Sequence, residues 1–331
     1  MRTLILGGTS WLGGVLAEVA SRRGHLVTCL ARGESGSAPD AVRWIRADRR
    51  GPGAYDAVRD DTWDAVLDVG RQPMHVRSAL AALAGRARHW AFVSTGSVYA
   101  DDSTAGQDES APLHAPWTGA GEAGDEDYGP AKVACERACQ EALPAERLLV
   151  ARAGLIAGYG DLSDRFGYWP ARLARGGEQR VLLPPRSNPV QVIDVKDLAA
   201  WLVHGAENAV AGVLNAVGNT LTLSDVLAEC QRAAASSPVY VEADQDWLIR
   251  HEVSPWSGPG SLPLWLPLPE YAGFMTRSNA AARAAGLRLR PLSETAADAL
   301  AWERRLGLDR ERKAGLGRQR EADLLSELAG R

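Results

Sequence analysis

Cysteine and histidine are scarce in this sequence, and neither forms a metal-binding pattern. The chain has 4 cysteines and 6 histidines among 331 residues. The cysteines lack the paired spacing of zinc sites, and no two histidines stand in a His-x-x-x-His arrangement. We therefore predict no metal site, and we interpret the cysteines as reduced packing residues. Two of them, Cys135 and Cys139, are expected on the same helix.

The sequence also lacks a long apolar run and a strong net charge of either sign. No hydrophobic stretch approaches the ~20 residues that a membrane helix requires, and the formal net charge is only −4. Without a broad basic field, nucleic acids and anionic membranes are disfavoured as the main partner. The first residues lead directly into a predicted strand. We expect a soluble, cytoplasmic protein whose partner is a small molecule.

What the sequence does have is a regular alternation of short apolar runs and stretches of helical periodicity. Hydrophobic residues make up 46% of the chain, which is enough to bury a large core. The predicted strands cover residues 3–7, 26–30, 42–46, 64–69, 89–94 and 147–152, and the predicted helices cover 11–23, 74–86 and 128–143. This alternation is typical of an α/β fold, in which helices cover both faces of a doubly wound parallel sheet.

A glycine-rich turn follows the first predicted strand and opens a helix. Gly7 allows the tight turn, and Gly13 lets the helix pack close to the strand. The helix N-terminus then offers N–H groups and a partial positive charge to a pyrophosphate. Ser10 stands where the middle glycine of such motifs lies, so its side chain comes near the phosphates and can offer a hydroxyl. The predicted nucleotide contacts in this turn are Gly7, Thr9, Ser10 and Gly13.

Tyr128 and Lys132 form the second informative motif. Residues four apart lie on one face of a helix, and an ammonium group one turn away favours the phenolate form of a tyrosine. Such a pair can exchange protons with a substrate during carbonyl reduction or alcohol oxidation. The fifth predicted strand runs into a cluster of hydroxyl groups, Ser94, Thr95 and Ser97. The carboxyl ends of parallel strands are where ligands bind in such folds.

Together these motifs resemble the extended short-chain dehydrogenase/reductase superfamily, in its NAD-dependent epimerase/dehydratase-like branch. The resemblance covers nearly the whole chain and is nearest to actinobacterial reductase-like members, through the opening turn and residues 194–199. It implies a Rossmann-like fold for the sheet. It also implies catalytic roles for three residues. Thr95 would hold the substrate oxygen, Tyr128 would act as acid or base, and Lys132 would orient the cofactor ribose.

The residues after the second and third predicted strands bear on the choice of nucleotide. Relatives that prefer NAD place an aspartate at the position of Ala31, and here the following residue is Arg32. A guanidinium there can bind a 2′-phosphate, so NADP is the predicted cofactor and NAD is the alternative. By the resemblance, Trp11 and Leu12 would contact the cofactor at its pyrophosphate, and Asp48 would hold the adenine amine. Further predicted cofactor contacts are Arg49, Val69, Gly70 and Arg71, although Arg49 and Arg71 could instead contact substrate or be exposed.

The order of elements predicts two lobes that share one cleft. Residues 1–155 would form the nucleotide-binding Rossmann core, and residues 190–234 would return to it. The substrate lobe would comprise residues 156–189 and 235–306, so it would be smaller, C-terminal and discontinuous. Residues 307–331 would form an amphipathic C-terminal helix of mixed charge, packed on the surface or on a partner subunit.

Two segments without regular periodicity are expected near the cleft. The stretch 99–127 is rich in Gly, Ala, Asp, Ser and Pro and leads into the tyrosine motif. Long loops in compact domains are usually functional, so it either borders the cleft or forms a disordered surface insertion. Residues 255–269 hold five prolines and two tryptophans, which excludes a regular helix. They form either an apolar wall of the substrate site or a proline-braced surface loop.

Several residues are candidates for contact with the substrate. The hydroxyls of Ser94 and Ser97, next to the predicted catalytic Thr95, are alternatives to it for holding the substrate oxygen. The candidate substrate contacts are Ser97, Trp169, Gln191 and Trp256, and either Arg165 or Arg186 would suit an anionic group.

The predicted function is hydride transfer between a nicotinamide cofactor and a carbonyl or alcohol carbon, catalysed by an NAD(P)-dependent oxidoreductase. Dehydration is disfavoured because Gly96 and Ser97 stand where dehydratase relatives place Asp-Glu. A sugar-nucleotide epimerase that retains NAD is the alternative, since transient oxidation uses the same residues. Some relatives are instead NADP-binding sensors or RNA-binding proteins, but these often lose the tyrosine or the lysine. The sequence leaves open whether the protein forms a homodimer through helices that flank the sheet.

Overall fold

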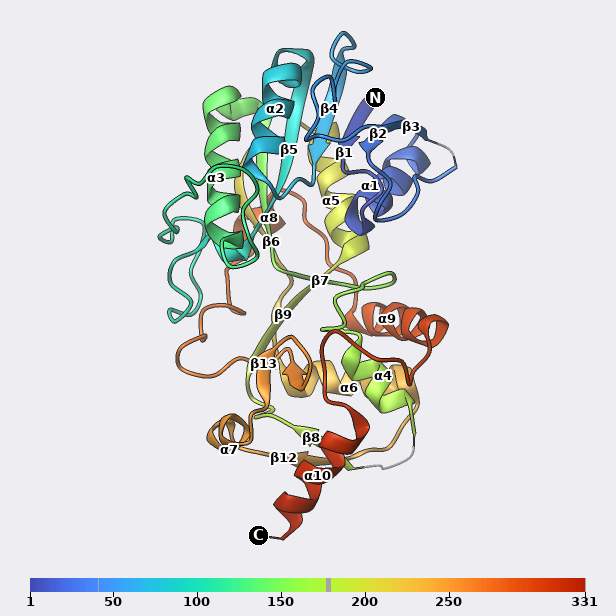
Figure 1. Ribbon diagram of the computed structural model, residues 1–331, viewed down its shortest axis with the longest axis vertical. Helices are drawn as coiled ribbons and strands as arrows, with labels where there is room; N and C mark the ends of the chain where they lie inside the picture. The colour runs from blue at the N-terminus through green and yellow to red at the C-terminus, as the bar shows by residue number, and fades with distance from the viewer. Residues whose placement is uncertain (41, 177–179, 331) are drawn as a thin grey trace.

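The centre of the protein is a seven-stranded parallel sheet (Figure 1). The computed structural model describes residues 1–40, 42–176 and 180–330. The strands lie in the order β10-β6-β5-β4-β1-β2-β3. Their bounds are Arg2–Leu6 (β1), Leu26–Ala31 (β2), Arg43–Arg46 (β3), Trp63–Asp68 (β4), Ala87–Thr95 (β5), Leu148–Ala153 (β6) and Gly212–Ala216 (β10). This order is that of a doubly wound, Rossmann-like sheet, which confirms the predicted fold class.

Helices cover both faces of this sheet, as expected for strands that are apolar on both sides. Helices α1 (Trp11–Arg22) and α5 (Val195–Glu207) pack together on one face, and α2 (Pro73–Leu83) and α3 (Tyr128–Ala142) pack on the other (Figure 1). Each face has its own hydrophobic cluster. The predicted strand and helix ends in this region differ from the observed ones by no more than a few residues.

A second group of elements lies below the carboxyl ends of the strands in Figure 1 and has a separate core. Three buried tryptophans, Trp169, Trp247 and Trp265, are among its largest side chains. Its strands are Leu155–Ala157 (β7), Arg180–Leu183 (β8), Pro189–Asp194 (β9), Thr220–Thr222 (β11), Val239–Glu242 (β12), Ser254–Trp256 (β13) and Ser261–Pro263 (β14). Its helices are Tyr168–Ala174 (α4), Leu223–Ala234 (α6), Gln245–Arg250 (α7), Leu292–Leu306 (α9) and Arg318–Ala329 (α10).

The chain crosses between the two groups at points that differ from the predicted boundaries. Helix α6 falls in the range predicted to return to the sheet, yet its apolar face joins the tryptophan core and packs against α4 and α9. Conversely, α8 (Ala280–Ala284) and Leu287 fall in the predicted substrate lobe but pack with α5 and β10 on the sheet. Each segment packs against the core that its apolar side chains complete. Helical periodicity marks an apolar face, but it does not show which of the two cores that face joins.

The C-terminal helix is shorter than predicted, since α10 begins at Arg318 and not near residue 308. The residues before it are irregular, and Gly315 has a φ of +123°, which a helix does not allow. Arg310 and Arg312 in this stretch bind the buried carboxylate of Glu303 on α9. The final residue of the predicted range, 331, lies outside the described residues.

The long stretch 99–127 is a fixed loop and not a disordered insertion. Tyr99 and Leu113 form an antiparallel bridge. The guanidinium of Arg277 donates to the backbone carbonyl of Asp101 (2.7 Å) and to the carboxylate of Asp102 (3.1 Å). The N–H of Gly273 donates to the carbonyl of Asp102. The loop is thereby joined to residues 273–277, which come from the far end of the sequence.

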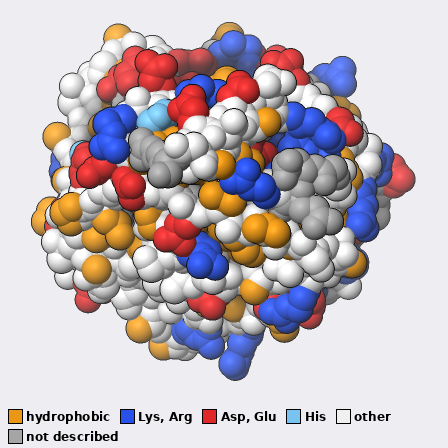
Figure 2. All heavy atoms as spheres, turned by 90° about the horizontal axis from the view of Figure 1, so that it is seen from below, with side chains coloured by type: hydrophobic (Ala, Val, Ile, Leu, Met, Phe, Trp, Pro, Cys, Tyr) orange, Lys and Arg blue, Asp and Glu red, His pale blue; other side chains and the backbone are white. Residues whose placement is uncertain are grey.

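The surface shows charges of both signs. Figure 2 views the end of the molecule formed by α10 and β12, where basic and acidic side chains are interspersed among apolar ones. Within the described residues, no helix is both long enough and apolar enough to cross a membrane.

Candidate functional site

A cleft of about 670 Å³ lies at the carboxyl ends of the sheet strands, where doubly wound folds bind their ligands. One wall comes from the sheet and the first helix, and the other from the second group of elements. Its volume is within the usual range of ligand sites. The sheet side contributes Ser10, Trp11, Leu12, Val69, Arg71, Thr95, Ser97, Tyr128 and Lys132. The opposite side contributes Asp161, Arg165, Gln191, Trp256, Phe274, Met275, Arg277 and Lys313.

The glycine turn brings α1 into close contact with the end of β1. Gly7 has a φ of +89°, and a Cβ atom on Gly13 would lie 2.2 Å from the Gly7 carbonyl oxygen. Ser10 caps α1, because its hydroxyl donates to that carbonyl (2.8 Å) and accepts from the Gly13 N–H (3.2 Å). The Ser10 hydroxyl is therefore used inside the turn, which differs from the expectation that it would be offered to a phosphate. The buried Thr9 precedes this cap.

Trp11 links the glycine turn to the second wall. Its indole N–H donates to the carbonyl of Tyr159 (2.8 Å), and Gly160 lies so close that an added Cβ would be 2.7 Å from the indole nitrogen. The neighbouring Leu12 lines the cleft beside it. As the first residues of a helix, Trp11 and Leu12 have backbone N–H groups without intrahelical acceptors. These groups are suited to an anionic ligand.

The structure brings the three predicted catalytic residues to one cleft from two elements. Thr95 ends β5, Tyr128 begins α3, and Lys132 follows one turn later. The start of α3 presses on the turn after β5, since a Cβ atom on Gly129 would lie 2.2 Å from the Ser97 carbonyl oxygen. The Thr95 hydroxyl donates to the Ser97 hydroxyl (3.3 Å). Ser97, a predicted substrate contact, thus adjoins Thr95 in the same cleft.

Lys132 is held deep in the floor of the cleft. Its side chain is buried, and its ammonium group donates to the carbonyls of Gly70 (2.8 Å) and Val93 (2.5 Å). The ammonium also lies 4.1 Å from the ring centroid of Phe92. These contacts place the lysine between the ends of β4 and β5. Gly70, with its neighbour Val69, therefore lies next to Lys132, one of the predicted catalytic residues.

Ser94 belongs to a buried polar network behind the predicted catalytic residues. Its hydroxyl donates to the carboxylate of Glu136 (2.5 Å), which forms a two-pronged ion pair with Arg152. Arg152 also donates to the hydroxyl of Tyr99 (3.1 Å) and to the carbonyl of Glu109 (3.2 Å). The Ser94 hydroxyl therefore has a structural partner, whereas Thr95 is the hydroxyl that accompanies Tyr128.

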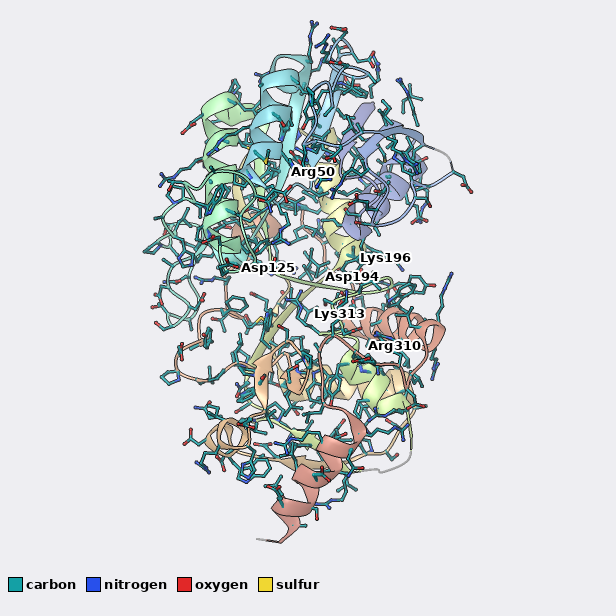
Figure 3. All side chains as sticks on the ribbon, viewed as in Figure 1. Arg50, Asp125, Asp194, Lys196, Arg310 and Lys313 are labelled. Carbon is teal, nitrogen blue, oxygen red and sulfur yellow. The ribbon has the colours of Figure 1, made fainter. Side chains whose placement is uncertain are left out.

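Basic side chains surround the ends of β2 and β3, where the sequence predicts the adenosine part of the cofactor. Arg32 follows β2 and pairs with the exposed Glu34 (3.0 Å). Asp48 pairs with Arg50 (2.7 Å), whose hydrogen bonds lower the pKa of the Asp48 carboxyl to about 2. Figure 3 shows Arg50 on this side of the sheet, well above the residues of the second wall. Arg46, which sequence reasoning did not select, lies over the ring of Trp44 (5.0 Å).

Two other arginines predicted to contact the cofactor have different environments. The guanidinium of Arg49 is occupied by two hydrogen bonds to the fully buried carboxylate of Asp68 (2.8 and 2.9 Å) and by bonds to Tyr55 and His75. It does not line the cleft, so a phosphate contact by Arg49 does not agree with the structure. Arg71 does line the cleft, and its guanidinium lies 5.5 Å from the Tyr128 ring centroid. It also pairs with Asp125 (2.6 Å).

Of the predicted substrate residues, some line the cleft and one does not. Trp256 and Gln191 line the cleft, and the Gln191 amide donates to the carbonyls of Gly218 (3.0 Å) and Arg277 (2.8 Å). Trp169 does not, because its side chain is 0% exposed and its indole N–H donates to the Pro263 carbonyl (2.9 Å). A direct substrate contact by Trp169 is therefore wrong.

The two arginines proposed for an anionic group also differ in position. Arg165 lines the cleft, whereas Arg186 forms an exposed ion pair with Glu242 (2.8 Å). Sequence reasoning missed Phe274, Met275 and Lys313, which lie in irregular segments far along the chain. No local pattern marks them. None of the described residues that line the cleft belongs to the loop 99–127, so that loop supports the cleft from behind through residues 273–277.

The described residues contain no cluster of three or more histidine, cysteine, aspartate or glutamate side chains suited to a metal ion. All four cysteines are buried and free.

Comparison with known proteins agrees with this arrangement. Residues 3–218 match the NAD dependent epimerase/dehydratase family. The chain is 28% identical to the Epimerase family protein SDR39U1 of Bos taurus over 239 residues, which are 66% of this chain and 74% of that protein. A solved protein from Burkholderia cenocepacia is 23% identical, with a TM-score of 0.70 and coverage of 92% of this chain and 98% of the other.

UDP-glucose 4-epimerase of Thermus thermophilus, solved in complex with NAD, is 19% identical, with a TM-score of 0.64. The alignment covers 92% of this chain and 99% of the epimerase. At this identity the likeness concerns the fold. The family match extends over most of the chain and includes both the glycine turn and the tyrosine motif. The chain belongs to the NAD dependent epimerase/dehydratase family, within the extended short-chain dehydrogenase/reductase superfamily.

Proposed function

We propose that this protein is an NAD(P)-dependent oxidoreductase that acts on a carbonyl or alcohol carbon of a small molecule. The observation that carries the proposal is the meeting of Thr95, Tyr128 and Lys132 in one cleft, directly beside the N-terminus of α1. These residue types supply a hydrogen-bond donor for the substrate oxygen, an exchangeable proton and a fixed positive charge. Family membership supports the same class of chemistry.

The cleft has the features that a dinucleotide requires. The close contact of Gly13 with Gly7 brings the N-terminus of α1 to the cleft, where the N–H groups of Trp11 and Leu12 suit the pyrophosphate. Lys132 suits the ribose next to the nicotinamide, because an ammonium has three N–H donors and only two are used by Gly70 and Val93. When bound, the cofactor would supply or accept a hydride at the substrate carbon.

The chain's own residues would handle the proton and the developing charge. The Tyr128 hydroxyl would give a proton to the substrate oxygen during reduction and take it back during oxidation. Thr95 would donate a hydrogen bond to the same oxygen and fix its position. The buried ammonium of Lys132 and the guanidinium of Arg71 would stabilise negative charge on the tyrosine oxygen. Gly96 and Ser97 offer no carboxylate for a dehydration step.

We propose NADP as the cofactor, because the cationic residue Arg32 follows β2 and two further guanidinium groups, those of Arg46 and Arg50, lie at the end of β3. Calorimetric titration with NADPH and with NADH tests this. We expect Arg32→Ala to weaken NADPH binding about 10-fold or more, the usual value for a lost charge-assisted hydrogen bond, and to leave NADH binding unchanged. Arg43→Ala, at the opposite end of β3, is the matched control. Equal loss for both nucleotides would contradict the role of Arg32.

An epimerase with permanently bound NAD is the second candidate, supported by the fold likeness to the NAD complex of the Thermus thermophilus epimerase. Analysis of the cofactor bound to the purified protein distinguishes the two functions. Release of NAD on denaturation, together with weak NADPH binding, would favour the epimerase. Exchangeable NADPH would favour the reductase.

The catalytic role is tested with Tyr128→Phe, which removes only the exchangeable proton. We expect NADPH-dependent reduction of a ketone panel to fall about 10²- to 10⁴-fold, while NADPH affinity stays near wild type. Tyr240→Phe is the control, since its hydroxyl contacts Gln231 in the second core. Tight NADPH binding without turnover of any carbonyl or alcohol in the wild type would instead indicate a non-catalytic, NADP-binding sensor.

A further inference from the structure

The wall of the cleft that faces the sheet carries positive charge without a matching acid. Arg165 and Lys313 both line this wall, and neither has an ion-pair partner in the described part of the chain. Among the described residues, the single carboxylate that lines the cleft is Asp161, which is buried and accepts hydrogen bonds from the N–H (2.8 Å) and hydroxyl (3.0 Å) of Ser163. Burial raises the pKa of Asp161, which further weakens its ability to balance the two cations.

A single buried carboxylate brings the two cationic residues together from distant parts of the sequence. Asp164 precedes Arg165 and has a φ of +62°, a left-handed conformation that aspartate tolerates better than most residues. Its carboxylate accepts from the backbone N–H of Lys313 (2.7 Å) and from the guanidinium of Arg310. Figure 3 shows Arg310 and Lys313 at the junction between the two groups of elements. Lys313 is thus fixed next to the loop that carries Arg165.

Contacts with two neighbouring side chains fix the position of the Arg165 guanidinium. Its guanidinium lies over the ring of Trp256, 5.0 Å from the centroid, and its Nε donates to the Ser163 hydroxyl (3.3 Å). Trp256 is in turn held edge-on by Phe274, at 5.2 Å between ring centroids. Burial lowers the pKa of the Arg165 guanidinium, and nearby Asp161 and Tyr128 oppose this effect. Arg165 lines the same cleft as the proposed catalytic tyrosine.

We propose that the substrate carries an anionic group, a carboxylate or a phosphate, that is bound jointly by Arg165 and Lys313 beside the Trp256 ring. This inference rests on the proposed function, since it names the substrate class of that same cleft. A planar guanidinium with a free N–H pair matches the two oxygens of such an anion. A neutral substrate would cover two cations without pairing them, which is unfavourable. The anion would also orient the reacting carbon toward Tyr128.

The test compares three ligands of one shape: benzoate, phenyl phosphate and the neutral benzamide. Their dissociation constants are measured by calorimetry on the full-length protein, with and without saturating NADP⁺. We expect at least one anion to bind about 10- to 100-fold more tightly than benzamide, the range for hydrogen bonds between charged groups. Preference for benzoate or for phenyl phosphate distinguishes the two sources of the charge. Arg165→Met and Lys313→Met should each remove most of the preference, and Arg186→Met should leave it unchanged.

Three results would overturn the proposal. The first is equal affinity of the wild type for all three ligands, including no measurable binding of any. The second is an anion preference that survives both substitutions. The third is a loss of NADP⁺ affinity in Arg165→Met with benzoate binding unchanged, which would assign the cation to the cofactor. A failure of the oxidoreductase proposal is recognised separately, because it leaves the anion preference intact while the wild type binds no nicotinamide nucleotide or turns over no substrate.

Discussion

The contact between Gly13 and Gly7 predicts opposite outcomes for two adjacent alanine substitutions in α1. A Cβ atom on Gly13 would lie 2.2 Å from the Gly7 carbonyl oxygen and 2.9 Å from the Cα of Gly8. Both are backbone atoms, so no side-chain rotation relieves the overlap, and the first turn of α1 must shift. Forcing an extra methyl group into a packed site typically costs about 1–3 kcal/mol. At Gly14 the added Cβ meets nothing within 4 Å.

The expected free energies of unfolding therefore differ in sign. Gly13→Ala should lower the stability by about 1–3 kcal/mol, and Gly14→Ala should raise it by about 0.5–1 kcal/mol, because alanine is favoured over glycine inside a helix. Urea denaturation measures both values from the midpoint and slope. The shift in Gly13→Ala also moves the N–H groups of Trp11 and Leu12. We expect its NADPH affinity to fall about 10-fold or more, as misplaced binding groups usually cause.

The pair of variants separates packing from helix propensity. If Gly13→Ala and Gly14→Ala change stability by the same amount and in the same direction, the close contact with Gly7 does not determine the effect. Wild-type NADPH affinity in a destabilised Gly13→Ala would mean that the N-terminus of α1 does not bind the pyrophosphate. Either result would refute the reasoning.

Two further predictions concern a buried and a partly buried charge. Arg152→Met should destabilise the protein by about 3–5 kcal/mol in urea denaturation, because it leaves the carboxylate of Glu136, only 1% exposed, without its counterion; a loss below about 1 kcal/mol would contradict the importance of this pair. Burial raises the pKa of Asp197 from 3.8 to about 6. The folded protein therefore binds this proton more tightly than the unfolded chain does. The stability that results is fully present below about pH 4 and is lost as the pH rises through 6. Asp197→Asn should accordingly gain stability relative to wild type over that interval, whereas a constant difference would show that Asp197 is not responsible.

The sheet and its helices were predictable because the signals are local. Each strand is a short apolar run, and each covering helix has one apolar face, so period and length identify them without knowledge of the fold. The Tyr128 and Lys132 motif was equally legible, since the separation of four residues alone puts both side chains on one helical face. The convergence of Thr95 on the same cleft followed from the rule that ligands meet the carboxyl ends of parallel strands.

The different environments of Arg49 and Arg71 could not be predicted from the sequence. Arg49 and Arg71 have similar positions after strands, yet Arg49 is bound to the buried Asp68 and Arg71 faces the cleft. The difference depends on a partner 19 residues away, which no local pattern reveals. Trp169 and Trp256 differ for the same reason, since a tryptophan in an apolar lobe packs in the core or lines a site according to its neighbours.

The loop that follows β7 explains how the two walls of the cleft are held in register. Its Tyr159 carbonyl accepts a hydrogen bond from the indole N–H of Trp11, the first residue of α1. A few residues later, Asp164 binds the backbone of Lys313, and Arg165 stacks on Trp256. One short segment therefore contacts the glycine turn, the C-terminal stretch and the proline-rich segment. If the cleft binds cofactor and substrate as proposed, this segment sets the distance between them, which hydride transfer requires to be fixed.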